Sequence, residues 1–149
     1  MLRRFTVIVG TVGLAAGICT APAGAVGSLA ASYAITYYRD GTGATYATAC
    51  VNFNVTSRSH GVVYGNWSSP SISGWSGQWL QKGEHFEWFG FYTSGNTVYE
   101  TSDSGDFINA TTATETSAIV NAQGSQGPLF NGTATLQAVR SCSGAPRLR

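Results

Sequence analysis

Acidic residues gather in one segment of the chain. Six of the seven Asp and Glu residues lie within residues 82–115, where Lys82 is the only Lys or Arg. Glycoside hydrolysis needs two carboxyl groups at a defined separation across the sugar. Glu87 and Glu100 share one face of an expected hairpin and are the pair suited to that chemistry, and His85 on the same face can pair with Glu87. The alternative is that these acids lie on solvated rims of the fold.

Aromatic residues are concentrated in the same region. The stretch GWSGQWLQKGEHFEWFGFY, residues 74–92, holds three of the four tryptophans and three of the seven phenylalanines. If residues 71–80 are extended, Trp75 and Trp79 stand on one strand face about 13 Å apart, at four residues of strand rise. A flat ligand such as a sugar can pack across two such rings. The alternative is that the tryptophans are core residues and that Gly77 makes room for them.

A hairpin is expected directly after the aromatic stretch. The GN pair at 95–96 separates two strand-like runs and predicts a two-residue turn that places Tyr92 opposite Tyr99. One face of the hairpin then carries Phe86, Trp88, Gly90, Tyr92 and Tyr99, and the other carries His85, Glu87, Phe89, Phe91, Val98 and Glu100. Because a surface hairpin is usually polar on one face, we expect a folded-over loop, a second copy of the chain or a ligand to cover the second face.

The aromatic residues predict a binding protein rather than an enzyme. We expect a glycan, such as a polysaccharide, or another cell-surface ligand to bind through an aromatic face, since exposed aromatic patches mark binding surfaces. The predicted ligand-binding residues are Trp67, Trp75, Trp79, Trp88 and Tyr92. Two alternatives stay open. One is a secreted hydrolase that uses Glu87 and Glu100, with His85 beside them. The other is a structural protein whose aromatic face enters a membrane interface or joins two copies as a homodimer.

Other catalytic and metal-binding patterns are weak. The two histidines, His60 and His85, are too few for a three-His zinc site, although a mixed His–carboxylate site stays open. The serines lack the Gly-x-Ser-x-Gly setting between a strand and a helix. The sequence SDSGD at 102–106 can form an Asx-type turn or a calcium loop, and the turn is favoured. We therefore expect neither a metal nor a cofactor.

Strand signals dominate the rest of the chain. The run TYATACVNFNVT, residues 45–56, alternates apolar and polar residues with a period of two, as a half-buried antiparallel strand does. Further strands are expected at 33–38, 61–67, 71–80, 85–92, 97–102, 112–120 and 133–139. The sequence thus predicts an all-β fold, a single-domain antiparallel β-sandwich or small barrel of about eight strands.

The first 25 residues read as a secretory signal. Arg3 and Arg4 precede a mostly apolar run over 5–18, and Ala-Gly-Ala at 23–25 supplies the small residues that signal peptidase requires. The run is too short to span a membrane. We therefore expect residues 1–25 to be cleaved, and the rest to be a secreted, extracellular protein without a transmembrane segment.

The exported part, residues 26–149, is expected to be one domain with a flexible tail over 143–149. It carries six Lys and Arg residues against seven Asp and Glu, a net charge of −1. Nucleic-acid binding needs a concentrated basic surface, so this class of partner is excluded. The two cysteines of this part, Cys50 and Cys142, are expected to form one disulfide in an oxidising compartment.

One short resemblance to a known family is present. The motifs WSGQW (75–79), TSG (93–95) and GDF (105–107) are similar to the later barrel strands of avidin-like biotin-binding proteins. The similarity covers about 30 residues. The early Gly-x-Trp strand and the ligand loop of that family are not found at matching distance, so no site residue is carried over.

Overall fold

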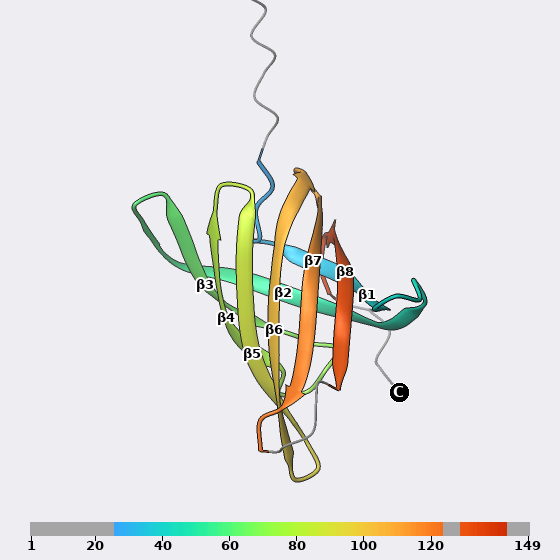
Figure 1. Cartoon of the computed structure of the whole chain (residues 1–149). Coiled ribbons are helices and arrows are strands. Elements are labelled where there is room, and N and C mark those ends of the chain that lie inside the picture. Colours follow the sequence, from blue (N-terminus) through green and yellow to red (C-terminus); the bar gives the residue numbers. More distant parts are fainter. Residues whose placement is uncertain (1–25, 124–128, 143–149) are drawn as a thin grey trace, which may run out of the picture.

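The computed structural model describes residues 26–123 and 129–142, which form eight antiparallel strands (Figure 1). The strands are β1 (Ser32–Arg39), β2 (Thr45–Ser59), β3 (Val62–Ser68), β4 (Ser76–Lys82), β5 (His85–Ser94), β6 (Thr97–Asn109), β7 (Thr112–Asn121) and β8 (Phe130–Val139). Each strand pairs with the next, and β8 pairs with β1, so the strands close into a barrel. The predicted signal peptide (1–25) and tail (143–149) lie outside the described residues.

The all-β class and the number of strands are confirmed, while two predicted boundaries are wrong. Strand β4 begins at Ser76, so residues 71–75 form a loop. Strand β6 continues to Asn109, so residues 102–106 form neither the predicted turn nor a calcium loop. These residues pair with β5 on one side and β7 on the other. Backbone hydrogen bonding to two neighbours outweighs the local turn preference of Asp, Ser and Gly.

The predicted hairpin is confirmed with its register. Ser94 lies opposite Thr97, and Tyr92 lies opposite Tyr99. Gly95 has a φ of 60°, the left-handed conformation that such a tight turn requires and that glycine adopts without strain.

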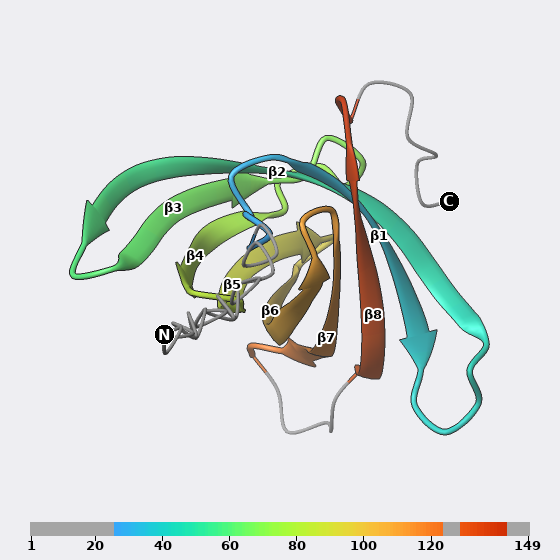
Figure 2. The same cartoon turned by 90° about the horizontal axis from the view of Figure 1, so that it is seen from above.

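The barrel interior is filled mainly by aromatic side chains. Seen from above, the strands curve around this interior (Figure 2). The four tryptophan side chains point inward and are only 1–3% exposed. The rings of Trp67, Trp75 and Trp88 pack against one another with centroid distances of 4.7–5.7 Å. Trp79 packs edge-on against Phe53 at 6.0 Å. These contacts make the tryptophans part of the core.

Glycines give the indoles their space. A Cβ atom at Gly90 would come within 2.3 Å of the Trp67 ring, and one at Gly65 within 2.2 Å of Trp79. Gly77, which the sequence suggested as the spacer, serves another purpose. A Cβ atom there would meet the backbone of β5, so this glycine lets two strands approach closely.

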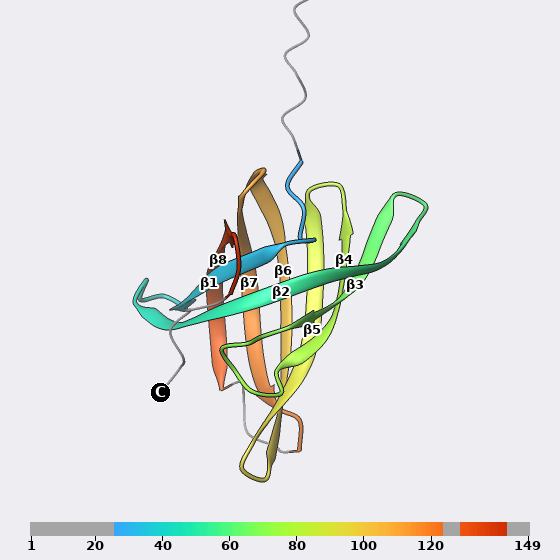
Figure 3. The same ribbon diagram turned by 180° about the vertical axis from the view of Figure 1, so that it is seen from behind.

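The two ends of the barrel differ. Residues 26–31 cross one end, which lies at the top of Figure 1, and Leu29 is fully buried there. The Gln81 side chain holds this segment: its Oε1 accepts a hydrogen bond from Leu29 N at 2.9 Å, and its Nε2 donates to Gly27 O at 2.7 Å. The opposite end carries the β5–β6 hairpin tip and the loop between β3 and β4. Strands β1 and β2 run obliquely across the others (Figure 3).

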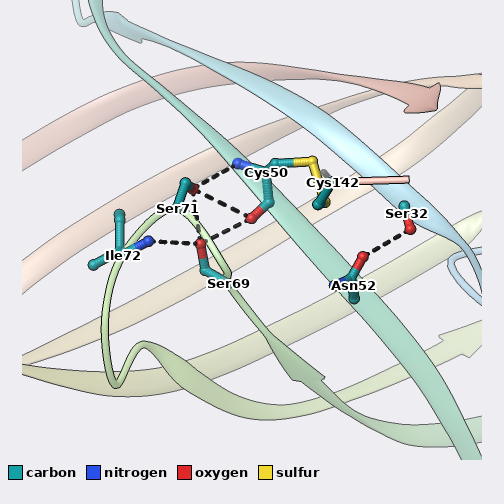
Figure 4. The surroundings of a disulfide bond; sticks show 7 residues. All are labelled: Ser32, Cys50, Asn52, Ser69, Ser71, Ile72 and Cys142. Carbon is teal, nitrogen blue, oxygen red and sulfur yellow. Dashed lines mark hydrogen bonds between the residues drawn. A yellow bond between two sulfur atoms is a disulfide. The ribbon is translucent and has the colours of Figure 1, made fainter. Parts of the chain in front are cut away.

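The predicted disulfide between Cys50 and Cys142 is confirmed, with a Cα–Cα distance of 5.5 Å. It joins β2 to the segment that follows β8. On the other side of Cys50, its backbone N–H donates to Ser71 Oγ at 2.9 Å, and its carbonyl accepts from Ser69 Oγ at 2.8 Å (Figure 4). The two serines therefore attach the β3–β4 loop to β2.

In the described ranges no helix has the length and apolar character needed to cross a bilayer.

Candidate ligand-binding site

A cavity of about 630 Å³ lies at the end of the barrel opposite residues 26–31. Its walls come from β1, β2, β5, β7 and the β3–β4 loop. It is lined by the aromatic residues Tyr37, Tyr46, Trp75 and Tyr92, by the hydroxyl residues Ser71, Ser73, Thr93 and Ser94, and by Ala47, Ile72 and Ile119. A cavity of this size that combines aromatic rings with a few polar groups is typical of a small-molecule site.

The structure separates the five predicted binding residues into two groups. Trp75 and Tyr92 line the cavity, and their ring centroids are 6.4 Å apart. Trp67, Trp79 and Trp88 are also buried but do not line it. The four indoles do not form an exposed patch, so any contact of a ligand with tryptophan must take place inside the barrel.

The hydrogen bonds of the indole N–H groups divide the four tryptophans differently. Trp67 Nε1 donates to two backbone carbonyls, and so does Trp79 Nε1, at distances of 3.0–3.3 Å. These bonds tie neighbouring strands together. By contrast, Trp75 Nε1 donates to the Thr101 hydroxyl at 3.2 Å and Trp88 Nε1 donates to Glu115 Oε2 at 2.7 Å. The last two indoles thus connect the core to polar side chains within the barrel.

Two acids lie inside the barrel. Asp103 on β6 and Glu115 on β7 are only 3% and 4% exposed, although both are carboxylic acids. Asp103 lies directly opposite Ser117, and Tyr37 from β1 has its hydroxyl buried in the same interior. Asp and Glu side chains are rarely buried without a partner for the carboxyl group, so burial must affect their protonation.

Burial sets the protonation of this cluster. Loss of hydration raises the pKa of Asp103 well above its usual value, and the adjacent Ser117 hydroxyl opposes this shift. The pKa of Glu115 is also raised well above its usual value, first by burial and then by the nearby Asp103 carboxyl, against the Trp88 hydrogen bond. Burial and the two acids raise the pKa of Tyr37 in the same way. The folded protein therefore favours protonated, neutral forms of the two acids.

These shifts predict that stability falls as the pH rises. The ordinary pKa values of Asp103 and Glu115 are 3.8 and 4.5, and burial in the folded state raises both. The folded protein then binds more protons than the unfolded chain above about pH 4, so the free energy of unfolding decreases with increasing pH in that window. Below the unfolded pKa values this stabilisation is fully present. Urea unfolding at pH 4, 5, 6, 7 and 8 measures the slope.

A pair of variants assigns that slope to the buried acids. Asp103→Asn combined with Glu115→Gln removes both titrations, so we expect a flatter pH dependence and a higher free energy of unfolding at pH 7. Glu84→Gln at the exposed β4–β5 turn is the matched control and should leave the slope unchanged. A wild-type protein whose stability rises from pH 4 to pH 7 contradicts this prediction.

The predicted catalytic acids lie on the outer surface. Glu87 pairs with Ser104 and Glu100 pairs with Phe91, which places the two acids four residues apart along the hairpin, about 13 Å by strand rise. That exceeds the carboxyl separation of about 5–9.5 Å that glycosidases use. His85 contacts Glu87 at 3.7 Å, as expected from their shared face, and Asp106 at 3.1 Å.

The described residues contain no group of three or more His, Cys, Asp and Glu side chains that could hold a metal ion.

Two phenylalanines remain on the outer face of the hairpin. Phe89 and Phe91 are 46% and 47% exposed, while Phe86 and Trp88 on the inner face are buried. The aromatic residues of the two faces therefore have different environments. The barrel covers the inner face, and in the single chain the outer face stays partly open.

Sequence reasoning missed the cavity residues Tyr37 and Tyr46 and the interior position of the two acids. For Asp103, the missed signal is parity: Thr101, Asp103, Gly105 and Phe107 share one face once β6 is extended. For Glu115, the neighbouring inward positions Ala113 and Ser117 give the same indication.

Comparison with known proteins found no matching family model, no similar curated protein and no similar solved structure. The function must therefore be argued from the site.

Proposed function

We propose that this chain binds the end of a glycan, or another small ring-shaped ligand of the cell surface, in the cavity at the open end of the barrel. Trp75 and Tyr92 are retained from the predicted set as contact residues, and Tyr37 and Tyr46 join them. Trp67, Trp79 and Trp88 support the walls from behind. The aromatic residues that contact the ligand then lie inside the barrel and not on an outer face of the sheet.

One observation supports this proposal most directly: four aromatic rings and four hydroxyl side chains line one cavity of about 630 Å³. Sugars present apolar ring faces and polar edges, which aromatic faces and hydroxyl groups match respectively. Residues 26–31 cover the opposite end of the barrel, where Leu29 is buried and bonded to Gln81, so we place the entrance at the end that carries the cavity. The β3–β4 loop that carries Ser71, Ser73 and Trp75 is attached to β2, which reduces the entropy lost on binding.

Removing the Tyr92 ring is expected to weaken binding. Tyr92 is half-buried at the cavity wall and stacks on Tyr99 at 4.9 Å, so Tyr92→Ala removes contact area without emptying the centre of the core. We expect about tenfold or greater loss of affinity, on the scale of an aromatic contact residue. Polysaccharide pull-down and titration against an oligosaccharide panel measure the loss.

Tyr64→Ala is the matched control, because Tyr64 is an exposed tyrosine on the outside of β3. It should bind like the wild type, and circular dichroism should show both variants folded. Equal binding by the Tyr92 and Tyr64 variants would show that the cavity is not the ligand-binding site. If the wild type binds no member of the panel, the proposal that the ligand is a glycan is wrong.

The exposed pair Phe89 and Phe91 supports one alternative function. These side chains offer an apolar outer surface through which the chain could join a second copy or enter a membrane interface. Light scattering of the wild type and of a Phe89→Ser, Phe91→Ser variant tests self-association. Liposome flotation of the same two proteins tests membrane contact. The hydrolase alternative with Glu87 and Glu100 gains no comparable support.

A further inference from the structure

The interior acids carry unsatisfied hydrogen-bonding capacity. Both carboxyl oxygens of Asp103 and the Oε1 atom of Glu115 are buried without a hydrogen-bond partner of good geometry in the structure. The same is true of the Tyr37 hydroxyl and of Ser117 Oγ. A buried polar group without a partner costs free energy, so proteins seldom retain several of them together unless water or a ligand supplies the missing bonds.

The side chains of the interior indicate which charge a ligand group beside the two acids would carry. Every described Lys, Arg and His is exposed, so the structure places no basic side chain in the interior beside Asp103 and Glu115. Three of the five unpartnered atoms are carboxyl oxygens, which accept hydrogen bonds when ionised. A ligand group that fits must therefore donate several hydrogen bonds and favour negative charge around it. A protonated primary amine has both properties.

The cavity and the acid cluster share walls. The Tyr37 ring lines the cavity, while its hydroxyl lies close enough to both acids for their charges to influence it. Trp75 also lines the cavity, and its Nε1 donates to Thr101, which is two residues from Asp103 on the same inward face of β6. The acids do not themselves line the cavity; Tyr37 connects them to it directly, and Trp75 does so through Thr101.

We propose that Asp103 and Glu115, with Tyr37 and Ser117, form the inner end of the binding site and receive a protonated primary amine carried by the ligand. This inference rests on the proposed function and narrows its ligand class to amino sugars or comparable ring-shaped amines. The amine donates to the carboxyl oxygens that lack partners. Trp88 keeps its hydrogen bond to Glu115 and orients that carboxyl group.

Binding of an amine must change the protonation of the pair. Burial raises the pKa of both acids and so favours their protonated forms in the free protein. An ammonium group stabilises the ionised carboxylate, so a proton leaves the pair for the solvent when the amine enters. Among the described residues, Tyr37 on β1 is the titratable side chain whose pKa the two acids raise. Strand β5 contributes Trp88, and the β8 position paired with Glu115 is Ala134. Affinity for the amine should therefore rise with pH until the amine itself loses its proton.

The experiment compares two probes of the same ring and linkage: β-1,4-linked glucosamine oligomers and their N-acetylated counterparts. Isothermal titration at a pH below the pKa of the probe amine should show about tenfold or tighter binding of the amine form. Repeating the titration in buffers of different ionisation enthalpy should reveal proton release for the amine probe alone. Trp88 emission should change with it, since Trp88 contacts Glu115.

Substitutions test which residues cause the preference for the amine probe. Asp103→Asn and Glu115→Gln should each remove most of the preference for the amine probe and the proton release, while Glu84→Gln should retain both. Tyr37→Phe, which keeps the ring and deletes the unpartnered hydroxyl, gives a second route if an acid variant fails to fold. It should weaken the amine probe more than the acetylated one.

The outcomes of this experiment separate the two proposals. Equal binding of both probes, unaffected by Asp103→Asn, overturns the amine site and leaves the glycan proposal intact. Binding of neither probe, with binding of another oligosaccharide, does the same. Absence of binding across the whole panel overturns both.

Discussion

Trp88→Ala is expected to lower the free energy of unfolding by about 3–5 kcal/mol, as truncation of a large core aromatic residue does. Trp88 is 1% exposed and packs against Trp67, Trp75 and Phe53. The substitution also deletes the N–H that donates to Glu115, which leaves a buried acid with no partner and adds about 1–3 kcal/mol. The sum approaches the whole stability of a small domain. Urea unfolding followed by circular dichroism measures the loss.

Trp88→Phe separates packing from hydrogen bonding, because it keeps an aromatic ring in the core and removes only the N–H donor and part of the volume. Its cost should be clearly smaller than that of Trp88→Ala. Phe89→Ala, the next residue on the outer face, is the matched aromatic control and should cost little, since Phe89 is 46% exposed. If Trp88→Ala and Phe89→Ala prove equally stable, Trp88 is not the central core residue described above.

Most of the fold could be predicted because β-strand alternation is a local signal. The run at 45–56 predicted a single strand, which is part of β2. The GN turn at 95–96 predicted the pairing of β5 with β6, and the register of this hairpin agrees residue by residue. The failures arise where pairing with neighbouring strands overrides the local signal. The SDSGD sequence has turn-forming composition, yet it continues β6 because β5 and β7 offer hydrogen bonds on both sides. Only the assembled barrel provides that information.

The site was predicted less well, since parity along a strand does not say which face lies inside. Trp75 and Trp79 do point the same way, but that way is the barrel interior. A half-buried sheet and a closed barrel give the same alternation, and they differ in how much of the inward face water reaches. Because the strands close into a barrel, the aromatic residues predicted to form a surface lie in the core, with a cavity at one end.

The interior acids could not be assigned from composition, because the six acids at 84–115 are alike in sequence and differ only in environment. Glu87, Glu100 and Asp106 lie on the outer face, whereas Asp103 and Glu115 lie within. The sequence signal that separates Asp103 and Glu115 from the outer acids is their alternation with the inward positions of β6 and β7. Such an inconsistency between pattern and residue type is expected at a functional site.

Removing the disulfide is expected to lower the free energy of unfolding by up to about 4–5 kcal/mol, the chain-entropy value for a loop of this length, since Cys50 and Cys142 are 92 residues apart. Replacement of both cysteines by alanine and reduction of the wild type by dithiothreitol should give similar losses in urea unfolding. Agreement between the two routes shows that the lost bond, and not the alanine side chains, causes the effect.

The disulfide prediction extends to the binding site through the β3–β4 loop. The backbone of Cys50 is hydrogen-bonded to Ser69 and Ser71 of this loop. The same loop places Trp75 at the cavity. Loosening β2 at Cys50 should therefore raise hydrogen exchange in residues 69–75 more than in the β5–β6 hairpin, and it should weaken ligand binding at temperatures where the protein is still folded. Ser69→Ala, with the disulfide intact, removes the bond from the loop to the Cys50 carbonyl without touching a residue that lines the cavity. It should reproduce the local exchange and the loss of binding without the global loss of stability. Uniform exchange changes in both variants would contradict this coupling, because they would show that the disulfide acts on the whole barrel and not on the loop.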